Sequence, residues 1–383
     1  MPGTPEADPS EWRTSLVRAE TDEGWTGRQW TSNVLVPAWA GDAGADQAVA
    51  SWNLDPDATA VVEIRARTAG ERWHPWQTVA LWGDIGRRSS AAPGGAAGAA
   101  SGAPTMETDV LTAGSAGSFD AVQLRITLGH EGQGEGREGE RDASRDALRL
   151  AAVSFSAPGR GAPASASASA TARDATPGPA EAGMVGAASA VQPLSQRAYP
   201  ARADLGGGGP AWCSPTSLTM IAGAWGARIP AAGSADVPAG ADPRVPWVAR
   251  AVYDAAYDGT GNWSFNVALA GALGFDALVT RLSSLRSARM LTDAGIPLVA
   301  SISFAPGELP GADYDTPGHL LVIRGFDADG DVLVADPSNP GGDAGLRTYP
   351  RRAFDDAWSH SRRTVYLIVP RGHNLPPSAE GEW

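Results

Sequence analysis

The chain has 383 residues, which is long for a single hydrophobic core and predicts about two domains. Its net charge is −13, all thirty basic residues are arginine, and no basic patch with interleaved aromatic residues occurs, which argues against nucleic acid as a partner. One cysteine excludes an intramolecular disulfide framework. No apolar run approaches the roughly 18 residues of a membrane span, so none is expected.

The first residues bear on localisation. Residues 1–8 are polar and acidic, so no signal peptide is visible in the sequence as given. The lack of a visible signal peptide predicts a cytoplasmic protein. If the true start lies upstream, a secreted protein is expected instead.

The first third of the chain shows the sequence pattern of short β-strands. Residues 1–20 show no clear period and are interpreted as a flexible arm. The strands expected after this arm are 25–30, 32–37, 60–67, 76–82, 121–128 and 148–155. Short strands broken by Gly, Pro and Asp are typical of an antiparallel β-sandwich, predicted here as an accessory domain over residues 21–157. Two low-complexity loops, 89–104 and 129–145, are interpreted as insertions between paired strands.

Tryptophan is abundant in this predicted sandwich. The seven tryptophans that suggest a function are Trp25, Trp30, Trp39, Trp52, Trp73, Trp76 and Trp82. Exposed tryptophan rings bind sugars, whereas buried ones are ordinary core residues. The sequence leaves both interpretations open, so contact with a glycan or cell-wall polymer is one possible role for this domain.

A second domain follows a linker. Residues 158–188 are rich in Ala, Ser, Pro and Gly and cannot bury enough apolar surface to fold alone. The predicted domain covers 189–372, followed by a tail over 373–383. Helices are expected at 215–225, 247–257, 263–274, 284–294 and 352–360, and strands at 276–282, 297–304, 319–326, 332–336 and 364–369. Helices followed by an antiparallel sheet predict an α+β fold.

The lone cysteine, Cys213, follows a glycine run, 206–209, and opens one of these helices. A free cysteine is commonly a small buried hydrophobic residue. A cysteine at a helix N-terminus can instead be a nucleophile, because the helix dipole lowers the pKa of its thiol. The partners available to Cys213 decide between these interpretations.

A cysteine nucleophile needs a base and a group that orients the base. Of the other histidines, His74 is expected in a loop of the sandwich and His130 in a low-complexity insertion. His360 is expected near a helix end and His373 in the tail. His319 opens an apolar strand, at the lip of a sheet where it could reach a helix end. Asp336 follows seventeen residues later, across the Asp329-Gly330 hairpin, and returns to the same end of the sheet.

These residues resemble a known family. Ala211-Trp212-Cys213-Ser214-Pro215-Thr216-Ser217, the segment from Gly318-His319 to Asp327, and Val334-Ala335-Asp336-Pro337 look like the C39-like peptidases of the papain-like superfamily. The resemblance covers roughly residues 190–370. It implies a papain-like fold with the cysteine at a helix N-terminus and His and Asp on adjacent strands.

The resemblance also implies roles for these residues. Cys213 would attack a carbonyl carbon to form an acyl-enzyme, His319 would act as base and then acid, and Asp336 would fix the imidazole. The family carries an upstream glutamine as oxyanion donor, a position that Gln196 fits and that Gln192 fits less well. The leading hypothesis is a cysteine peptidase-like hydrolase that cleaves a peptide or amide bond in a peptide or protein substrate.

Two alternative functions remain open at this point. The same triad could transfer the acyl group to an amine, or the chain could be a non-catalytic binding protein with a degenerate peptidase scaffold.

Asp327-Ala328-Asp329-Gly330-Asp331 resembles part of a calcium loop but lacks the later carboxylate, so a solvated turn is expected. Asp313 and Asp315 are loop charges or line a substrate cleft. No metal or nucleotide motif occurs, so no cofactor is expected.

Overall fold

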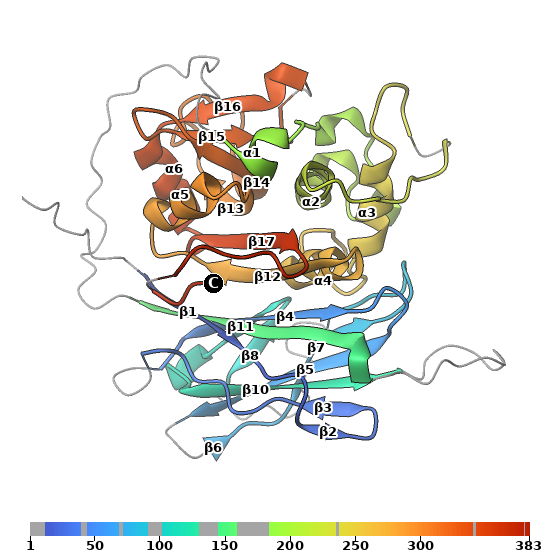
Figure 1. Ribbon diagram of the computed structural model, residues 1–383, viewed down its shortest axis with the longest axis vertical. Coiled ribbons are helices and arrows are strands. Elements are labelled where there is room, and N and C mark those ends of the chain that lie inside the picture. Colours follow the sequence, from blue (N-terminus) through green and yellow to red (C-terminus); the bar gives the residue numbers. More distant parts are fainter. Residues whose placement is uncertain are drawn as a thin grey trace, which may run out of the picture.

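The computed structural model describes residues 12–39, 44–68, 72–90, 102–129, 145–158, 184–234, 237–339, 342–378 and 380–383. These residues form two domains stacked along the long axis of the molecule (Figure 1). The first domain contains strands β1 to β11, and the second contains helices α1 to α6 with strands β12 to β17. The central parts of both predicted insertions, and residues 159–183 of the predicted linker, lie outside the described residues.

The first domain is built from two antiparallel sheets that share a core. One sheet has the order β1-β11-β4-β9-β8, and the other has β2-β3-β10-β5-β6 with β7 also paired to β5. The strands are β1 (Trp12–Arg18), β2 (Trp25–Thr26), β3 (Gln29–Thr31), β4 (Gln47–Leu54), β5 (Ala60–Thr68), β6 (Arg72–Trp73), β7 (Gln77–Trp82), β8 (Thr105–Glu107), β9 (Val110–Thr112), β10 (Ala121–Leu128) and β11 (Leu148–Pro158). Alternating burial along β5 and β10 places one face of their sheet against the other sheet.

Two expectations for this domain are wrong, and one of its central strands was not expected. Part of the predicted arm, residues 12–18, is strand β1, which pairs with β11 along its whole length. Residues 32–37 form no strand, although Leu35 makes one bridge to Val122. Strand β4 was not expected, because its residues are buried on both faces and show no alternation of apolar and polar side chains.

The tryptophans of the first domain are mostly core residues. Trp30, Trp52 and Trp82 are buried, and Trp25, Trp39, Trp73 and Trp76 are half-buried. The guanidinium group of Arg65 stacks on the rings of Trp73 and Trp76, at 4.6 and 4.5 Å from their centroids. Arginines therefore already occupy part of the ring surface that a sugar would need.

The second domain is a single antiparallel sheet with helices on both faces. Its sheet order is β12-β17-β13-β14-β15-β16. The elements are α1 (Gly186–Ala190), α2 (Cys213–Ala224), α3 (Arg244–Val252), α4 (Trp263–Ala272), β12 (Phe275–Arg281), α5 (Leu285–Asp293), β13 (Leu298–Phe304), β14 (Thr316–Phe326), β15 (Val332–Ala335), β16 (Leu346–Tyr349), α6 (Arg351–Ser359) and β17 (Thr364–Pro370). One core packs α2, α3 and α4 on one face, and a second packs α5 and α6 on the other.

The boundaries of this domain differ from those expected. Helix α1 begins at Gly186, inside the predicted linker, and Ala188 donates a backbone hydrogen bond to Gly295. The predicted helix 247–257 is instead α3, which begins at Arg244 and ends at Val252. It ends there because the Asp254 carboxylate accepts backbone N–H groups beyond it and closes a turn.

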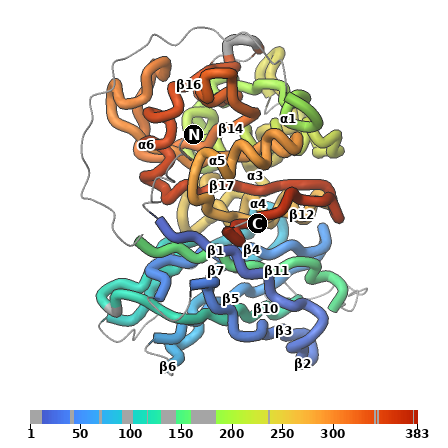
Figure 2. Tube along the Cα trace, turned by 60° about the vertical axis from the view of Figure 1, so that its left-hand side comes forward, coloured from blue at the N-terminus to red at the C-terminus, as the bar shows by residue number. Residues whose placement is uncertain are grey.

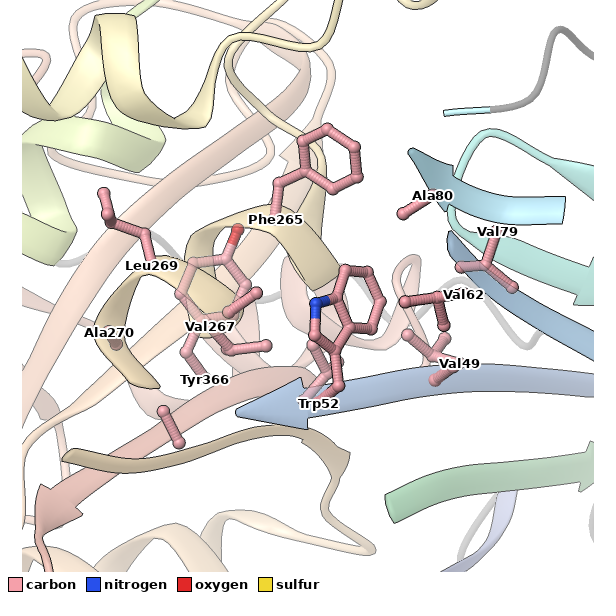
Figure 3. Close-up of a cluster of buried hydrophobic side chains, with 14 of the residues drawn as sticks. Val49, Trp52, Val62, Val79, Ala80, Phe265, Val267, Leu269, Ala270 and Tyr366 are labelled. Atoms are coloured by element: carbon pink, nitrogen blue, oxygen red, sulfur yellow. The ribbon is translucent and has the colours of Figure 1, made fainter. Parts of the chain in front are cut away.

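The two domains share a continuous hydrophobic core. Trp52 of β4 packs against Phe265 of α4 with ring centroids 6.3 Å apart (Figure 3). The ring of Trp82 lies 5.5 Å from the same phenylalanine ring. Polar bonds cross the junction as well: Asn53 Nδ2 donates to the Ala277 carbonyl at 2.8 Å, and Ala277 N–H donates to Asn53 Oδ1 at 2.9 Å. The first domain is therefore part of the frame that supports the second.

The predicted tail also packs at this junction. The backbone N–H of Leu16 in β1 donates to the Gly381 carbonyl, and the Thr280 hydroxyl of β12 donates to the Glu382 carbonyl. Figure 2 shows the C-terminal end lying where β1 and β4 meet β12 and β17. This segment therefore joins the two domains.

Candidate active site

Cys213 is the first residue of α2, and its side chain is held at the base of a cleft. The residue is 9% exposed. Two bonds fix the first turn of α2 on the sheet: the Ser217 hydroxyl donates to the Leu320 carbonyl at 3.0 Å, and the hydroxyls of Ser214 and Tyr366 hydrogen-bond at 2.9 Å. Pro215 occupies the first turn, where its missing N–H costs no helical bond. The sequence thus places the thiol where backbone N–H groups favour its anionic form.

His319 lies on β14 opposite Ile302 of β13, beside an irregularity in strand pairing. The register between β13 and β14 shifts between Ile302 and Phe304. Such bulges are common next to active sites because they redirect side chains. His319 is buried, and its ring lies edge-on to that of Tyr314 with centroids 5.3 Å apart. The imidazole is therefore held in one orientation.

Asp336 directly follows β15 and is 0% exposed. His319 Nε2 donates to Asp336 Oδ1 at 2.9 Å, which leaves Nδ1 for Cys213 because the carboxylate only accepts. The Ser338 backbone N–H donates to the same oxygen at 2.8 Å, and the hydroxyls of Tyr314 and Tyr349 donate to Oδ2 at 2.8 and 2.7 Å. Four donors therefore satisfy a buried negative charge.

The pKa values of Cys213, His319 and Asp336 depend on one another. Burial by itself raises the pKa of the Cys213 thiol, but its hydrogen bond and attraction to His319 bring the pKa below the ordinary value. Burial lowers the pKa of His319, but the charge and hydrogen bond of Asp336 outweigh this and raise it. Burial raises the pKa of Asp336, and His319 with the two tyrosines lowers it overall. The arrangement favours a thiolate beside an imidazolium.

Gln196 lies in a short 3₁₀ turn, Gln196–Ala198, and lines the same cleft as Cys213 and His319. Its Nε2 donates to the Pro210 carbonyl at 2.9 Å, which fixes the orientation of the amide and leaves a second N–H. Its backbone N–H donates to the Pro337 carbonyl at 2.9 Å, next to Asp336. The turn is therefore anchored both to the loop that precedes Cys213 and to the loop that follows Asp336.

The glycine run explains how Gln196 and Cys213 come together although they are seventeen positions apart in the sequence. Gly208 has φ +75°, and a Cβ there would lie 2.2 Å from the backbone nitrogen of Arg202. A Cβ on Gly209 would lie 2.2 Å from the carbonyl oxygen of Tyr199 and 2.6 Å from that of Gln196. Only glycine allows this close backbone approach.

Cys213, His319 and Gln196 line one cleft of about 1270 Å³, with Asp336 buried behind His319. The cleft is lined by the residues that lead into α2, by Cys213 at its start, and by the ends of β13 and β14. Its size suits an extended peptide segment rather than a single small molecule.

The other residues considered from the sequence lie in different parts of the structure. His74 bonds Thr68 in the first domain, His373 packs on Trp225, and His130 lies outside the described residues. Asp315 is exposed and lines the cleft. Asp327 Oδ1 accepts the backbone N–H groups of Asp329 and Asp331, so its carboxylate closes a hairpin turn. Across the described ranges, no group of three or more His, Cys, Asp or Glu side chains is placed to hold a metal ion.

Several residues of this region were missed from the sequence. Tyr314 reaches Asp336 from the loop before β14 and Tyr349 from the end of β16, a convergence that no local pattern signals. His360 lines the cleft and donates from Nδ1 to the Ser303 carbonyl at 2.7 Å. Glu107 and Thr108, at the tip of the β8–β9 hairpin, line it from the first domain. The hairpin is short and adjoins a low-complexity segment, which hid it.

Two family models match the chain. Residues 189–366 match the Peptidase_C39 like family, and residues 6–138 match the Peptidase C39 N-terminal domain. The second domain belongs to the C39-like peptidase family. The resemblance seen in the sequence is thereby confirmed, and this chain spans about 60% of the length of the C39-like structure that it matches. No curated protein matches the chain.

Two solved structures show limited likeness to this C39-like protein. One is described as a C39-like peptidase from Bacillus anthracis, with 20% identity, 29% of this chain and 60% of that chain covered, and a TM-score of 0.23. The other is from the Gt strain of infectious bursal disease virus, with 11% identity, 41% and 40% covered, and a TM-score of 0.19. Neither likeness extends beyond a part of either fold. Among the described residues, no helix combines the length and apolar character needed to cross a bilayer.

Proposed function

We propose that this protein is a papain-like cysteine hydrolase that cleaves a peptide or amide bond through Cys213, His319 and Asp336. The observation that carries the proposal is the Nε2–Oδ1 bond of 2.9 Å between His319 and Asp336, with the other imidazole nitrogen left for the thiol of Cys213. A nucleophile, a base and an orienting carboxylate in this order are the requirement for acyl transfer through a thiol. All three side chains also contact partners outside the triad.

The reaction follows from the charges. The Cys213 thiolate attacks the carbonyl carbon, a C–S bond forms, and negative charge develops on the carbonyl oxygen. The second N–H of Gln196 Nε2 and the Cys213 backbone N–H stabilise that oxygen. His319 then gives its proton to the leaving amine as the C–N bond breaks. Water, deprotonated by His319, attacks the thioester carbonyl and forms a C–O bond. The C–S bond then breaks, the carboxylic acid product leaves, and the thiolate and imidazolium are restored.

The first test is thiol reactivity. Because the pKa of Cys213 is lowered, iodoacetamide should alkylate it about 10- to 100-fold faster at pH 6.5 than it alkylates an unperturbed thiol. His319→Ala leaves the thiol buried without its counter-charge, so the alkylation rate at pH 6.5 should fall by a similar factor and recover as the pH is raised. The rate is read by mass spectrometry of the intact protein.

The second test is turnover. The protein is incubated with a peptide library, with and without added amines, and the products are read by mass spectrometry beside a Cys213→Ala control. New peptide termini support hydrolysis, and amine adducts would favour an acyltransferase. An inert Cys213 with no product in either mixture would overturn the proposal in favour of a non-catalytic binding protein.

A further inference from the structure

The aromatic side chain of Tyr257 stands in the cleft beside the proposed nucleophile. The residue is 49% exposed, although most large apolar side chains of this domain are buried. It follows the turn closed by Asp254, whose Oδ1 accepts the Ala256 and Tyr257 backbone N–H groups at 3.1 and 3.3 Å. Asp254 Oδ1 also accepts the Ser90 backbone N–H of the first domain at 2.7 Å. The position of the ring is therefore set by both domains.

The Tyr257 ring packs against the backbone of Gly259 and Gly261. A Cβ on Gly259 would lie 2.5 Å from Tyr257 Cε1, and a Cβ on Gly261 would lie 3.6 Å from its hydroxyl. A side chain at Gly259 would thus push the ring away. The glycines support the ring from one side, and its exposed surface is available to a molecule in the cleft.

The β8–β9 hairpin of the first domain adds charge to this end of the cleft. Glu107 is exposed and lines the cleft together with Thr108 and Asp258. The hairpin is fixed because Gln77 Oε1 accepts the Met106 N–H at 3.0 Å, and because the Asp109 carboxylate accepts the Trp263 N–H at the start of α4. The hairpin tip is thus tied to the helix that begins just after the Tyr257 loop.

The basic residues of the cleft are engaged elsewhere. Arg197 hydrogen-bonds the Ser338 hydroxyl, on the side of Asp336, and His360 bonds the carbonyl of Ser303 at the end of β13. Asp258 Oδ1 accepts a bond from the Tyr253 hydroxyl at 2.7 Å. The wall around Tyr257 therefore combines an aromatic ring with carboxylates.

We propose that Tyr257, Glu107 and Asp258 form a substrate subsite for a cationic side chain of the lysine or arginine type, which makes the first domain a selectivity element of the active site. The alkyl stem of such a side chain lies along the ring, and its cationic group meets the ring face and the Glu107 carboxylate. An acidic side chain would be repelled there. This subsite rests on the proposed peptide hydrolysis, because the cleft that holds it is the one above Cys213.

The experiment uses internally quenched octapeptides with acetylated N-termini, each with lysine, arginine, norleucine or glutamate at one scanned position. The wild-type protein should prefer lysine or arginine over norleucine at one position by about 5- to 20-fold in kcat/KM. Raising the salt from 50 to 500 mM should reduce this preference, because an exposed carboxylate is screened.

Variants then assign the preference to residues. Glu107→Gln should lower the lysine-to-norleucine ratio about 3- to 10-fold, and so should Tyr257→Ala, whereas Tyr257→Phe should keep the ratio within about twofold. Asp57→Asn is the matched control, since Asp57 is an exposed acid of the same domain outside the cleft. It should leave the ratio unchanged.

The results separate the two proposals. The same peptide pairs are measured for binding to Cys213→Ala by fluorescence anisotropy, which tests the subsite without cleavage. Equal binding and cleavage of lysine and norleucine peptides would overturn the subsite while leaving hydrolysis intact. A preference that survives both Glu107→Gln and Tyr257→Ala, or one that appears only with a free N-terminal amine, would also overturn it. Selective binding without any cleavage would support the subsite and overturn hydrolysis.

Discussion

Asp336 shows how a single buried charge organises the proposed site. Its carboxylate accepts bonds from His319, Ser338 and two tyrosine hydroxyls, and no part of it contacts solvent. Each charge-assisted bond is worth roughly 1.5–3 kcal/mol. The tyrosines keep the carboxyl group ionised at low pH, so the imidazole keeps its orienting charge there.

Replacing Tyr314 tests this role at the residue scale. Burial raises the pKa of Asp336, and Tyr314 is one of the donors that lower it, so Tyr314→Phe should raise it. As the pH is lowered, the Asp336 carboxylate is then protonated, and loses its negative charge, at a higher pH than in the wild type. The acidic limb of the Cys213 alkylation profile should move up by about 1 pH unit.

The matched control for this prediction is Tyr253→Phe. It removes a tyrosine–aspartate bond of similar length, 2.7 Å, that does not involve the triad. The control should leave the profile in place. An unchanged profile in Tyr314→Phe would mean that Tyr314 packs against His319 without influencing Asp336.

At the scale of elements, the glycine run is the clearest case of a sequence feature explained by backbone contact. The four glycines carry the chain past the Gln196 turn and back to the start of α2. Gly209 has an ordinary backbone conformation, so its requirement for glycine comes from crowding and not from strain.

This gives a sharp test. Gly209→Ala places a methyl group 2.2 Å from the carbonyl oxygen of Tyr199, so the Gln196 turn must move. We expect a loss of about 1–3 kcal/mol in the free energy of unfolding and a reduced kcat, measured by urea denaturation and peptide turnover. Gly233→Ala, with nothing within 4 Å of its new Cβ, should stay within about 0.5 kcal/mol of the wild type. Equal behaviour of the two variants would contradict the crowding argument.

At the scale of the whole molecule, the two domains behave as one folded unit. Strand β4 has the sandwich core on one face and α4 and β12 on the other (Figures 1 and 3). Arg281 of β12 is buried at this junction and donates to Ser156 of β11 and to Gln47 of β4. Separating the domains would expose apolar surface and leave this charge without its partners.

Trp52→Ala tests the shared core. Removing a fully buried indole costs about 3–5 kcal/mol, and because its contacts lie in both domains, both should be affected. Calorimetry should show one transition in the wild type and one at a Tm lower by about 5–10 °C in the variant. Trp73→Ala, at a half-buried ring on the outer sheet, should cost much less. Two separate transitions would show that the domains fold independently.

The sequence alone was sufficient for the family and for most elements of the second domain. Cys213, His319 and Asp336 stand in recognisable local contexts, and helices and strands of the α+β domain have clear periodicity or turn signals. The family match confirms that resemblance, and the roles of the three residues remain a proposal. The apolar strands β13, β14 and β17 were also expected within a few residues of their observed bounds.

The tertiary structure decided what converges from a distance. Strand β4 was not expected because the sandwich core covers one of its faces and α4 and β12 cover the other, which removes the alternation that marks a strand. Strand β1 was not expected because its pattern of buried and half-buried residues does not alternate. Tyr314, Tyr257 and Glu107 reach the cleft from three separate parts of the chain, and Tyr349 reaches Asp336 from the end of β16. Their positions depend on contacts between elements far apart in the chain, and local sequence carries no record of such contacts.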